Sequence, residues 1–223
     1  MIPLYDDNPT HRFPFLTILL IAANVLVFFG WQTQIGLRES VMAAGFIPAE
    51  LGMNTAPGAT HLLTSMFMHG GIMHLLGNMW FLWIFGDNVE NECGSVRFLI
   101  FYLVCGIAAT LSYARFNPNS LVPLVGASGA ISGVLGAYLV RHPHASIRTL
   151  IPMGLFTRIV DVPAWVFLFV WIGMQVLSQA AQAGRHGGGG VAYLAHIGGF
   201  IAGAGFIFVF GENAKPASRS RRR

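Results

Sequence analysis

Six long apolar stretches with few charged side chains constrain the fold of this chain more than any other feature. They lie at residues 16–31, 72–89, 98–113, 127–140, 163–180 and 191–210. A helix needs roughly 20 residues to cross a hydrocarbon core about 30 Å thick, so these stretches predict membrane-crossing helices whose ends extend by a few residues. The fourth stretch is the shortest and predicts a helix of about 14 residues, or about 21 Å.

The composition excludes an ordinary soluble domain. Of the 223 residues, 54% are hydrophobic and 10% are charged, and the mean hydropathy is +0.61. These values are typical of proteins that cross a membrane several times. The sequence therefore predicts an all-α polytopic membrane protein, a compact bundle of six transmembrane helices with a short fourth helix.

The distribution of Lys and Arg predicts the orientation of the bundle. Ten of the 13 lie at the two ends of the chain and in the second and fourth connections, whereas Arg38, Arg115 and Arg185 lie in the other three connections. By the positive-inside rule both termini are cytoplasmic. Five basic residues gather between Lys215 and Arg223, next to a membrane helix, which favours lipid headgroups over nucleic acid as partners.

A single membrane domain is expected. Residues 1–13 form a short cytoplasmic N-terminus, residues 14–211 the six-helix membrane domain, and residues 212–223 a basic, disordered cytoplasmic tail. The longest connection, about residues 32–64, contains two prolines and many apolar residues. Part of this connection is expected to lie in the membrane interface, where it shields or lines another part of the protein.

Small residues recur at four-residue spacing in the fourth and sixth stretches. Gly129 is followed by Gly133, and Gly199 by Gly203. Such spacing lets two helix backbones approach closely, so these two helices are expected to pack against each other. Their packing would bring Ser128 towards His196.

Ser128 stands at the predicted start of the fourth helix, within Gly126-Ala127-Ser128-Gly129. A helix start exposes backbone N–H groups and the positive end of the helix dipole, and both suit a developing oxyanion. The irregular segment 121–125 before it requires cover by protein or by a water-filled cavity. The alternative is that the four small residues form only a close-packing motif.

His196 lies in the sixth stretch, one to two turns from its start. An ionisable side chain at membrane depth is costly and therefore marks a candidate functional site. A hydrogen-bonded structural histidine is the alternative. A serine and a histidine on two helices that pack together favour nucleophilic catalysis.

His74 and Asn78 lie four residues apart in the second stretch and share one helical face. An amide is no base at neutral pH, but it can donate a hydrogen bond to a developing negative charge. The alternative is a hydrogen bond between helices. His69, just before this helix, is expected to brace the connection and not to catalyse.

Metal and aspartyl chemistry fit the sequence less well. There are eight histidines but no His-Glu-x-x-His motif, and His69, His74 and His196 have no evident carboxylate partner. Asp87 and Asp161 both fall near the predicted cytoplasmic boundary, so they do not form a facing pair. We therefore expect no metal and no cofactor.

Three ordered segments resemble the rhomboid family of intramembrane serine proteases, from about His61 to Gly203. They read HLLTSMFMHGGIMHLLGNMWFLWIFGDNVE, GASGAISGVLGAY and GGVAYLAHIGGFIAG. The resemblance implies the minimal six-helix fold of bacterial members. It also implies cleavage of membrane-anchored proteins near their transmembrane segments. The minimal form suggests a bacterial cytoplasmic membrane, and an organelle membrane is the alternative.

The resemblance also implies a role for each matching residue. Ser128 is the nucleophile and His196 its general base, in a dyad without a third acid that works through an acyl-enzyme. The oxyanion is held by His74, Asn78 and the backbone amide of Ser128. Three glycines support the site, of which Gly126 keeps the backbone open and Gly199 and Gly203 allow close packing, and Glu90 has a structural role.

Two positions depart from the family pattern. Thr60-His61 stands where a Trp-Arg pair is frequent, and Ser132 stands where some relatives have an aromatic residue four positions after the serine. The second departure leaves open what supports the ring of His196.

Two other functions fit the same fold. A rhomboid-like pseudoprotease would bind transmembrane helices without cutting them, but the four polar residues of the expected site argue against it. A small transporter would use polar residues to line a solute path, but the chain has no inverted repeat. The sequence does not reveal the natural substrate, a regulator or the oligomeric state.

Overall fold

The computed structural model describes residues 1–51, 56–153, 156–182 and 191–211, which are mostly helical. The long helices are α1 (Phe15–Val27), α6 (Ile72–Cys93), α7 (Ser95–Phe116), α8 (Ser128–Arg141), α9 (Ala164–Gln182) and α10 (Tyr193–Phe210). The short helical segments are the π-helix η1 (Phe28–Gln32), α2 (Thr33–Ile35), α3 (Leu37–Ala44), α4 (Pro48–Leu51), α5 (Ala56–Thr64) and the 3-10 turn η2 (Ser65–Phe67). The strands are β1 (Ile2–Asp6), β2 (Ser146–Met153) and β3 (Phe156–Pro163).

Each of the six apolar stretches forms a helix, and the first continues from α1 through η1 and α2. Within the described residues, four segments are long and apolar enough to cross a membrane: Phe15–Ile35, Ser95–Phe116, Ala164–Gln182 and Tyr193–Phe210. The chain is therefore a multi-pass integral membrane protein. Helix α8 has 14 residues, and α6 carries three carboxylates in its last two turns. That these two helices also cross the membrane stays a prediction.

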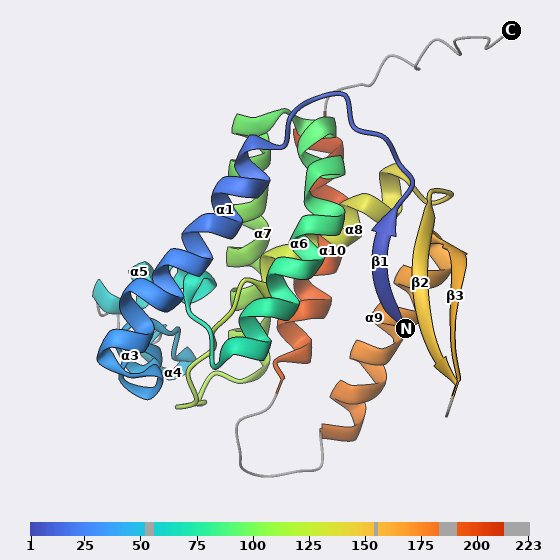
Figure 1. The fold of residues 1–223 in the computed structure, drawn as a ribbon. Helices are drawn as coiled ribbons and strands as arrows, with labels where there is room; N and C mark the ends of the chain where they lie inside the picture. The colour runs from blue at the N-terminus through green and yellow to red at the C-terminus, as the bar shows by residue number, and fades with distance from the viewer. Residues whose placement is uncertain (52–55, 154–155, 183–190, 212–223) are drawn as a thin grey trace, which may run out of the picture.

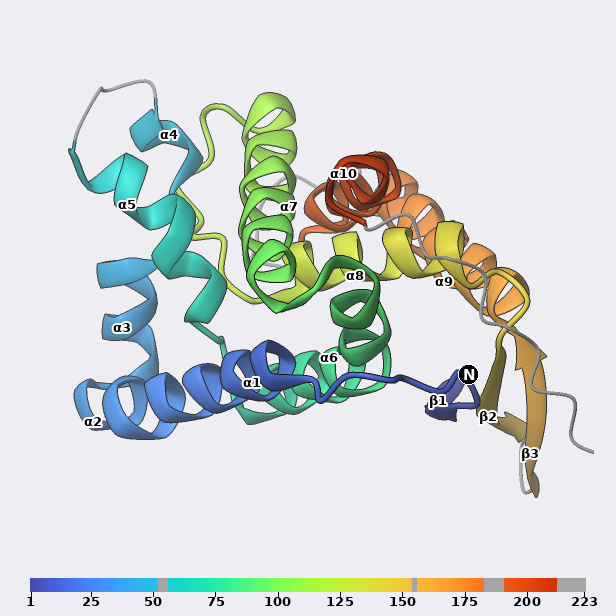
Figure 2. The same ribbon diagram turned by 90° about the horizontal axis from the view of Figure 1, so that it is seen from above.

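Helix α8 lies among α6, α7, α9 and α10 and contacts all four. Its small residues face those of α10, with which it lies side by side in Figures 1 and 2. A methyl group at Gly199 would overlap the carbonyl oxygen of Gly129, and one at Gly203 would overlap that of Gly133. The two backbones therefore meet directly, with no side chain between them.

A three-stranded antiparallel sheet lies beside the bundle, on the side opposite α3, α4 and α5 (Figures 1 and 2). Strands β2 and β3 form the hairpin between α8 and α9, and β1 pairs with β2 from Ile2 opposite Leu150 to Asp6 opposite Ile147. The expectation of an all-α fold is corrected here to a mostly helical one. Residues 1–13, expected as a plain terminus, contain β1, which local pattern does not reveal because its partner strand β2 begins only at Ser146.

Glu90 joins the ends of three helices. Its carboxylate is 2% exposed and accepts hydrogen bonds from the backbone N–H groups of Leu16 at 3.0 Å and Thr17 at 2.8 Å, and from the hydroxyl of Ser95 at 2.6 Å. A carboxylate at a helix N-terminus satisfies backbone donors that have no partner within the helix. The structural role expected for Glu90 is confirmed.

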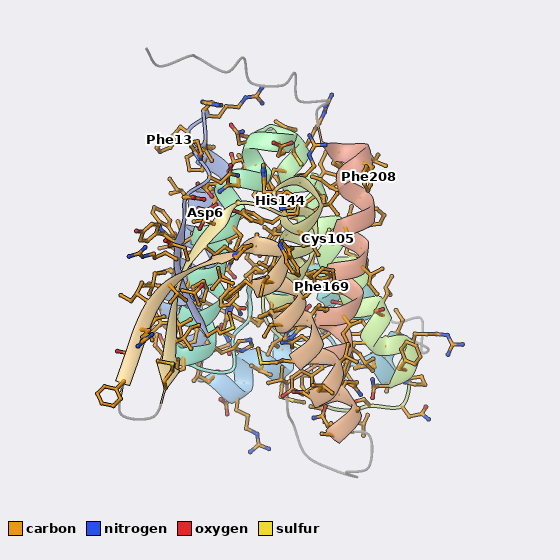
Figure 3. All side chains as sticks on the ribbon, turned by 90° about the vertical axis from the view of Figure 1, so that its right-hand side faces the viewer. Asp6, Phe13, Cys105, His144, Phe169 and Phe208 are labelled. Carbon is orange, nitrogen blue, oxygen red and sulfur yellow. The ribbon has the colours of Figure 1, made fainter. Side chains whose placement is uncertain are left out.

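The outer surface of the bundle is apolar, as contact with lipid requires. Figure 3 shows Phe208 at the outside of α10 and Cys105 within the bundle, and their exposed fractions are 73% and 0%. Both cysteines are buried and neither belongs to a disulfide, which fits a packing role. The predicted tail, residues 212–223, lies outside the described residues.

Candidate active site

Ser128 is the first residue of α8 and is half-buried. The chain reaches it through Gly126, which has φ of 120°, a conformation that glycine adopts readily and other residues rarely do. The turn directs the start of α8, with its free N–H groups, towards α6 and α10. Ser128 thus lies where a helix begins inside the protein.

The connection between α2 and α6 covers the irregular segment before Ser128. Phe46, which is fully buried, exchanges two backbone hydrogen bonds with Leu124, of 3.0 and 2.7 Å. The N–H of Gly126 donates to the carbonyl of Ser65 at 2.9 Å. These bonds satisfy backbone groups that cannot face lipid, so the long connection lines the site. A cavity of about 10 Å³ adjoins Ser128, enough for about one water molecule.

The packing of α8 against α10 brings Ser128 and His196 together. The Oγ of Ser128 lies 2.8 Å from the Nε2 of His196, a hydrogen-bonding distance between a hydroxyl and an imidazole. The two residues are 68 positions apart in the chain. This contact is the geometry that a serine nucleophile and its general base require.

Aromatic rings and an amide surround the ring of His196. The ring of Trp171 lies 6.1 Å away at 34°, and that of Tyr193 lies 6.5 Å away, edge to face. The Nδ1 of His196 lies 2.9 Å from the Oε1 of Gln175. Ser132 lies elsewhere, donating to the carbonyl of Ser128 at 2.6 Å. The ring of His196, whose support the sequence left open, is therefore held largely by residues of α9.

Sequence reasoning missed Gln175. A signal was present, because Gln175 is a polar residue in the apolar stretch 163–180 and lies one helical turn after Trp171. Its importance depends on how α9 is rotated, and the apolar pattern of a lipid-facing helix does not reveal that rotation.

His74 and Asn78 face Ser128 from α6, across Gly126. A Cβ atom at Gly126 would lie 2.7 Å from the Nε2 of His74 and 3.5 Å from the Nδ2 of Asn78. The Nδ2 of Asn78 is buried and has no acceptor within the described residues. The N–H of Gly70 donates to the Nδ1 of His74 at 3.4 Å, so the proton of a neutral ring lies on Nε2. Both side chains therefore present donors to the space beside Gly126.

His69 braces this part of the site from outside the helices. Its ring is fully buried and packs edge to face against that of His74, with 5.2 Å between centroids. Its backbone N–H donates to the side chain of Gln32 at 2.9 Å. Burial, and to a smaller extent His74, lowers the pKa of His69 to about 4, so the ring is neutral at physiological pH. This matches the bracing role expected from the sequence.

The described residues offer no metal centre. No group of three or more His, Cys, Asp and Glu side chains within them is arranged to hold a metal ion. Asp161 pairs with Arg148 in the sheet, at 2.8 Å. The site is therefore built from a serine, two imidazoles, two side-chain amides and backbone N–H groups.

Comparison with known proteins points to one family. A family model, the Rhomboid domain, matches residues 57–213. The chain is 33% identical over 192 residues to Rhomboid protease GluP of Bacillus subtilis, covering 86% of this chain and 34% of that protein. It is 32% identical over 141 residues to the human mitochondrial presenilin-associated rhomboid-like protein, covering 62% and 36%.

A third relative is Rhomboid protein 1, mitochondrial, of Saccharomyces cerevisiae, 28% identical over 196 residues, covering 84% of this chain and 51% of that protein. The chain thus spans about a third to a half of the length of these three relatives.

Proposed function

Because the chain belongs to the rhomboid family of membrane proteins, we propose that it is an intramembrane serine protease. It would hydrolyse peptide bonds in or near the transmembrane segments of other proteins. The observation that carries the proposal is the 2.8 Å contact between Ser128 Oγ and His196 Nε2, at a helix start inside the protein. A purely structural histidine has no need of a serine placed beside free backbone donors.

The reaction would proceed through an acyl-enzyme. Ser128 Oγ attacks the carbonyl carbon of the peptide bond while its proton passes to His196 Nε2. The protonated imidazole then gives that proton to the leaving amine. A water molecule, deprotonated by the same histidine, cleaves the ester and restores Ser128. Serine, histidine and water supply every group that this chemistry needs, so we propose no cofactor and no metal.

The oxyanion would lie beside Gly126. Its donors are the N–H of Ser128, the Nδ2 of Asn78 and the Nε2–H of His74. Support comes from the buried, unpaired state of Asn78 Nδ2 among the described residues, since a buried donor without a partner costs free energy unless it serves another purpose. The tautomer that Gly70 favours for His74 supports the same assignment.

We propose that both termini face the cytoplasm, with membrane lipids around the bundle and next to the basic tail. A bacterial cytoplasmic membrane is the proposed location. Two of the relatives are named as mitochondrial proteins, so a mitochondrial membrane is the alternative. Substrates would be membrane-anchored proteins with a small residue at the cleavage position.

Helix α9 would act as a lateral gate for these substrates. Its fully buried residues, Ala164, Phe167 and Leu168, all lie in its first two turns. Phe167 meets Phe85 of α6 with 6.2 Å between ring centroids, whereas Phe169 is 58% exposed. If α9 is the gate, crosslinking it to α6 should block cleavage of membrane substrates. Full activity in the crosslinked protein would exclude the gate.

The test of the function is cleavage of a panel of single-span proteins in proteoliposomes, by wild type, Ser128→Ala and His196→Ala. Cleavage by wild type alone is expected, together with labelling of Ser128 by a fluorophosphonate. Intact substrates that co-purify with an unlabelled wild-type protein would instead indicate a pseudoprotease. Solute flux that survives Ser128→Ala would indicate a transporter.

A further inference from the structure

Gln175 reaches the active site from α9, on the side of His196 that faces away from Ser128. Its Oε1 lies 2.9 Å from His196 Nδ1, while the opposite ring nitrogen lies 2.8 Å from Ser128 Oγ. The imidazole is thus held at both nitrogens by side chains from two other helices. The family comparison and the sequence motifs assign no role to Gln175.

The contacts of Gln175 determine which imidazole nitrogen carries the proton. The Nε2 of Gln175 donates to the carbonyl of Trp171 at 3.3 Å, so the amide oxygen is the atom directed at the ring. An amide oxygen only accepts hydrogen bonds. His196 Nδ1 must therefore carry the proton, and the lone pair of the neutral ring lies on Nε2, facing the hydroxyl of Ser128.

We propose that Gln175 is a positioning residue that holds His196 in the tautomer and orientation needed to deprotonate Ser128. The proposal rests on the proposed serine protease function. Gln175 would do for orientation what a buried aspartate does in a three-residue serine site. As a neutral group it avoids burying a carboxylate at membrane depth, where an unpaired charge is costly.

The position of Gln175 couples the base to α9. It lies beyond the first two turns, which contain the helix's fully buried residues, and its amide forms a hydrogen bond from α9 to α10. Movement of α9 away from α10 would break this bond and release the imidazole. The base is therefore fully oriented only when this part of α9 is in place.

Three variants test the proposal. Gln175→Met keeps the length of the side chain but removes the acceptor, and Gln175→Glu keeps an acceptor. Gln179→Met makes the same chemical change as the first, one helical turn further along α9. For each we would measure kcat and KM, the pH profile of kcat/KM, the rate of fluorophosphonate labelling of Ser128, and the thermal unfolding midpoint.

Gln175→Met is expected to lower kcat and the labelling rate by about 10- to 100-fold, because an unoriented base loses part of the 10²- to 10⁴-fold contribution of general base catalysis. KM and the unfolding midpoint should stay close to wild type, and Gln179→Met should match wild type in every measurement. Gln175→Glu should be labelled faster than Gln175→Met, because it keeps an acceptor for His196 Nδ1. Since a carboxylate stabilises imidazolium, this variant should also move the acidic limb of the pH profile of kcat/KM to higher pH. The other titratable groups beside the ring, His74 and Tyr193, are unchanged in all three variants.

Wild-type kcat and labelling in Gln175→Met would overturn the proposal, as would equal losses in both Met variants. The labelling rate tests the role of Gln175 independently of the proposed protease function. Labelling that is fast in wild type and slow in Gln175→Met, without cleavage of any substrate, would support the role of Gln175 and reject the protease. If wild type is not labelled, both the role of Gln175 and the proposed protease function are rejected.

Discussion

Gly126 has no side chain, and this lets two donors of α6 face the start of α8. Any larger residue would press against the ring of His74 and would also be strained at a φ of 120°. The space kept free lies beside the side-chain donors of His74 and Asn78 and the start of α8 at Ser128. The proposed oxyanion site therefore depends on the absence of a side chain at Gly126.

Asn78→Ala should reduce kcat by about 100- to 1,000-fold while leaving KM largely unchanged, because removing one oxyanion donor from a serine hydrolase has an effect of that size. The measurement is steady-state cleavage in proteoliposomes. Gly77→Ala is the matched control, since a Cβ at Gly77 meets no atom within 4 Å, and it should keep wild-type rates. A wild-type kcat in Asn78→Ala would show that Asn78 only packs against its neighbours.

Sequence patterns single out the residues of the proposed site, but not the residues that support them. Ser128, His196, His74 and Asn78 stand out because polar groups are rare in apolar stretches. Trp171 does not stand out, because an aromatic residue in a membrane helix is ordinary, and its packing against His196 depends on the rotation of α9. Support from a neighbouring helix is a tertiary property that spacing within one stretch does not record.

The contact between α8 and α10 sets the distance between the serine and the histidine. Gly199 and Gly203 place backbone against backbone, and His196 lies one turn before Gly199. Because packed interiors transmit displacements instead of absorbing them, a bulkier residue at this contact should move the imidazole away from Ser128.

Gly203→Val should inactivate the protein and lower its thermal unfolding midpoint. The added side chain would collide with the carbonyl of Gly133. Overpacking of this kind costs about 1 to 3 kcal/mol, and a displacement of about 1 Å at the site can cost about 100-fold in rate. Gly205→Val is the control, because a Cβ at Gly205 meets no atom within 4 Å. Equal effects of the two variants would mean that helix propensity, and not packing, is responsible.

Helices and sheet differ in how well sequence predicts them. The apolar stretches predicted the long helices to within a few residues at most ends, because helix length follows from the thickness of the bilayer. The sheet was not predicted. Strand β1 has only five residues, and its partner β2 lies beyond α8, so its pairing is set by the folded bundle and not by local pattern.

Strand β1 connects parts of the bundle that are far apart in the chain. The carbonyl of Pro3 accepts a hydrogen bond of 2.7 Å from Trp80 of α6. Asp6 Oδ2 accepts hydrogen bonds from Tyr138 of α8 at 2.5 Å and from Asn88 of α6 at 2.9 Å. Since β1 also pairs with the hairpin that leads into α9, it ties α6 and α8 to the start of the proposed gate helix.

This connection should depend on pH through Asp6. Burial raises the pKa of Asp6 from 3.8 to about 6, the hydrogen bond from Tyr138 opposes the rise, and Asp87 adds to it. A carboxyl group with a raised pKa stabilises the folded state when it is protonated. The stabilisation is therefore complete below about pH 4 and is lost as the pH rises to about 6, with a total of at most about 3 kcal/mol.

Asp6→Asn isolates this effect, because an amide resembles the protonated acid at every pH. In detergent, the unfolding midpoint of wild type minus that of Asp6→Asn should fall as the pH rises from 4 to 6 and stay level above pH 6. Taking this difference cancels the contributions of the other carboxylates.

Tyr138→Phe removes the hydroxyl that opposes the rise in the Asp6 pKa. The unfolding midpoint of Tyr138→Phe should therefore keep falling to a higher pH than that of wild type. A constant difference between wild type and Asp6→Asn would mean that Asp6 is ionised in the folded protein throughout. The ionised carboxylate would still accept the hydrogen bonds of Tyr138 and Asn88, and the link between β1 and the bundle would not respond to pH in this range.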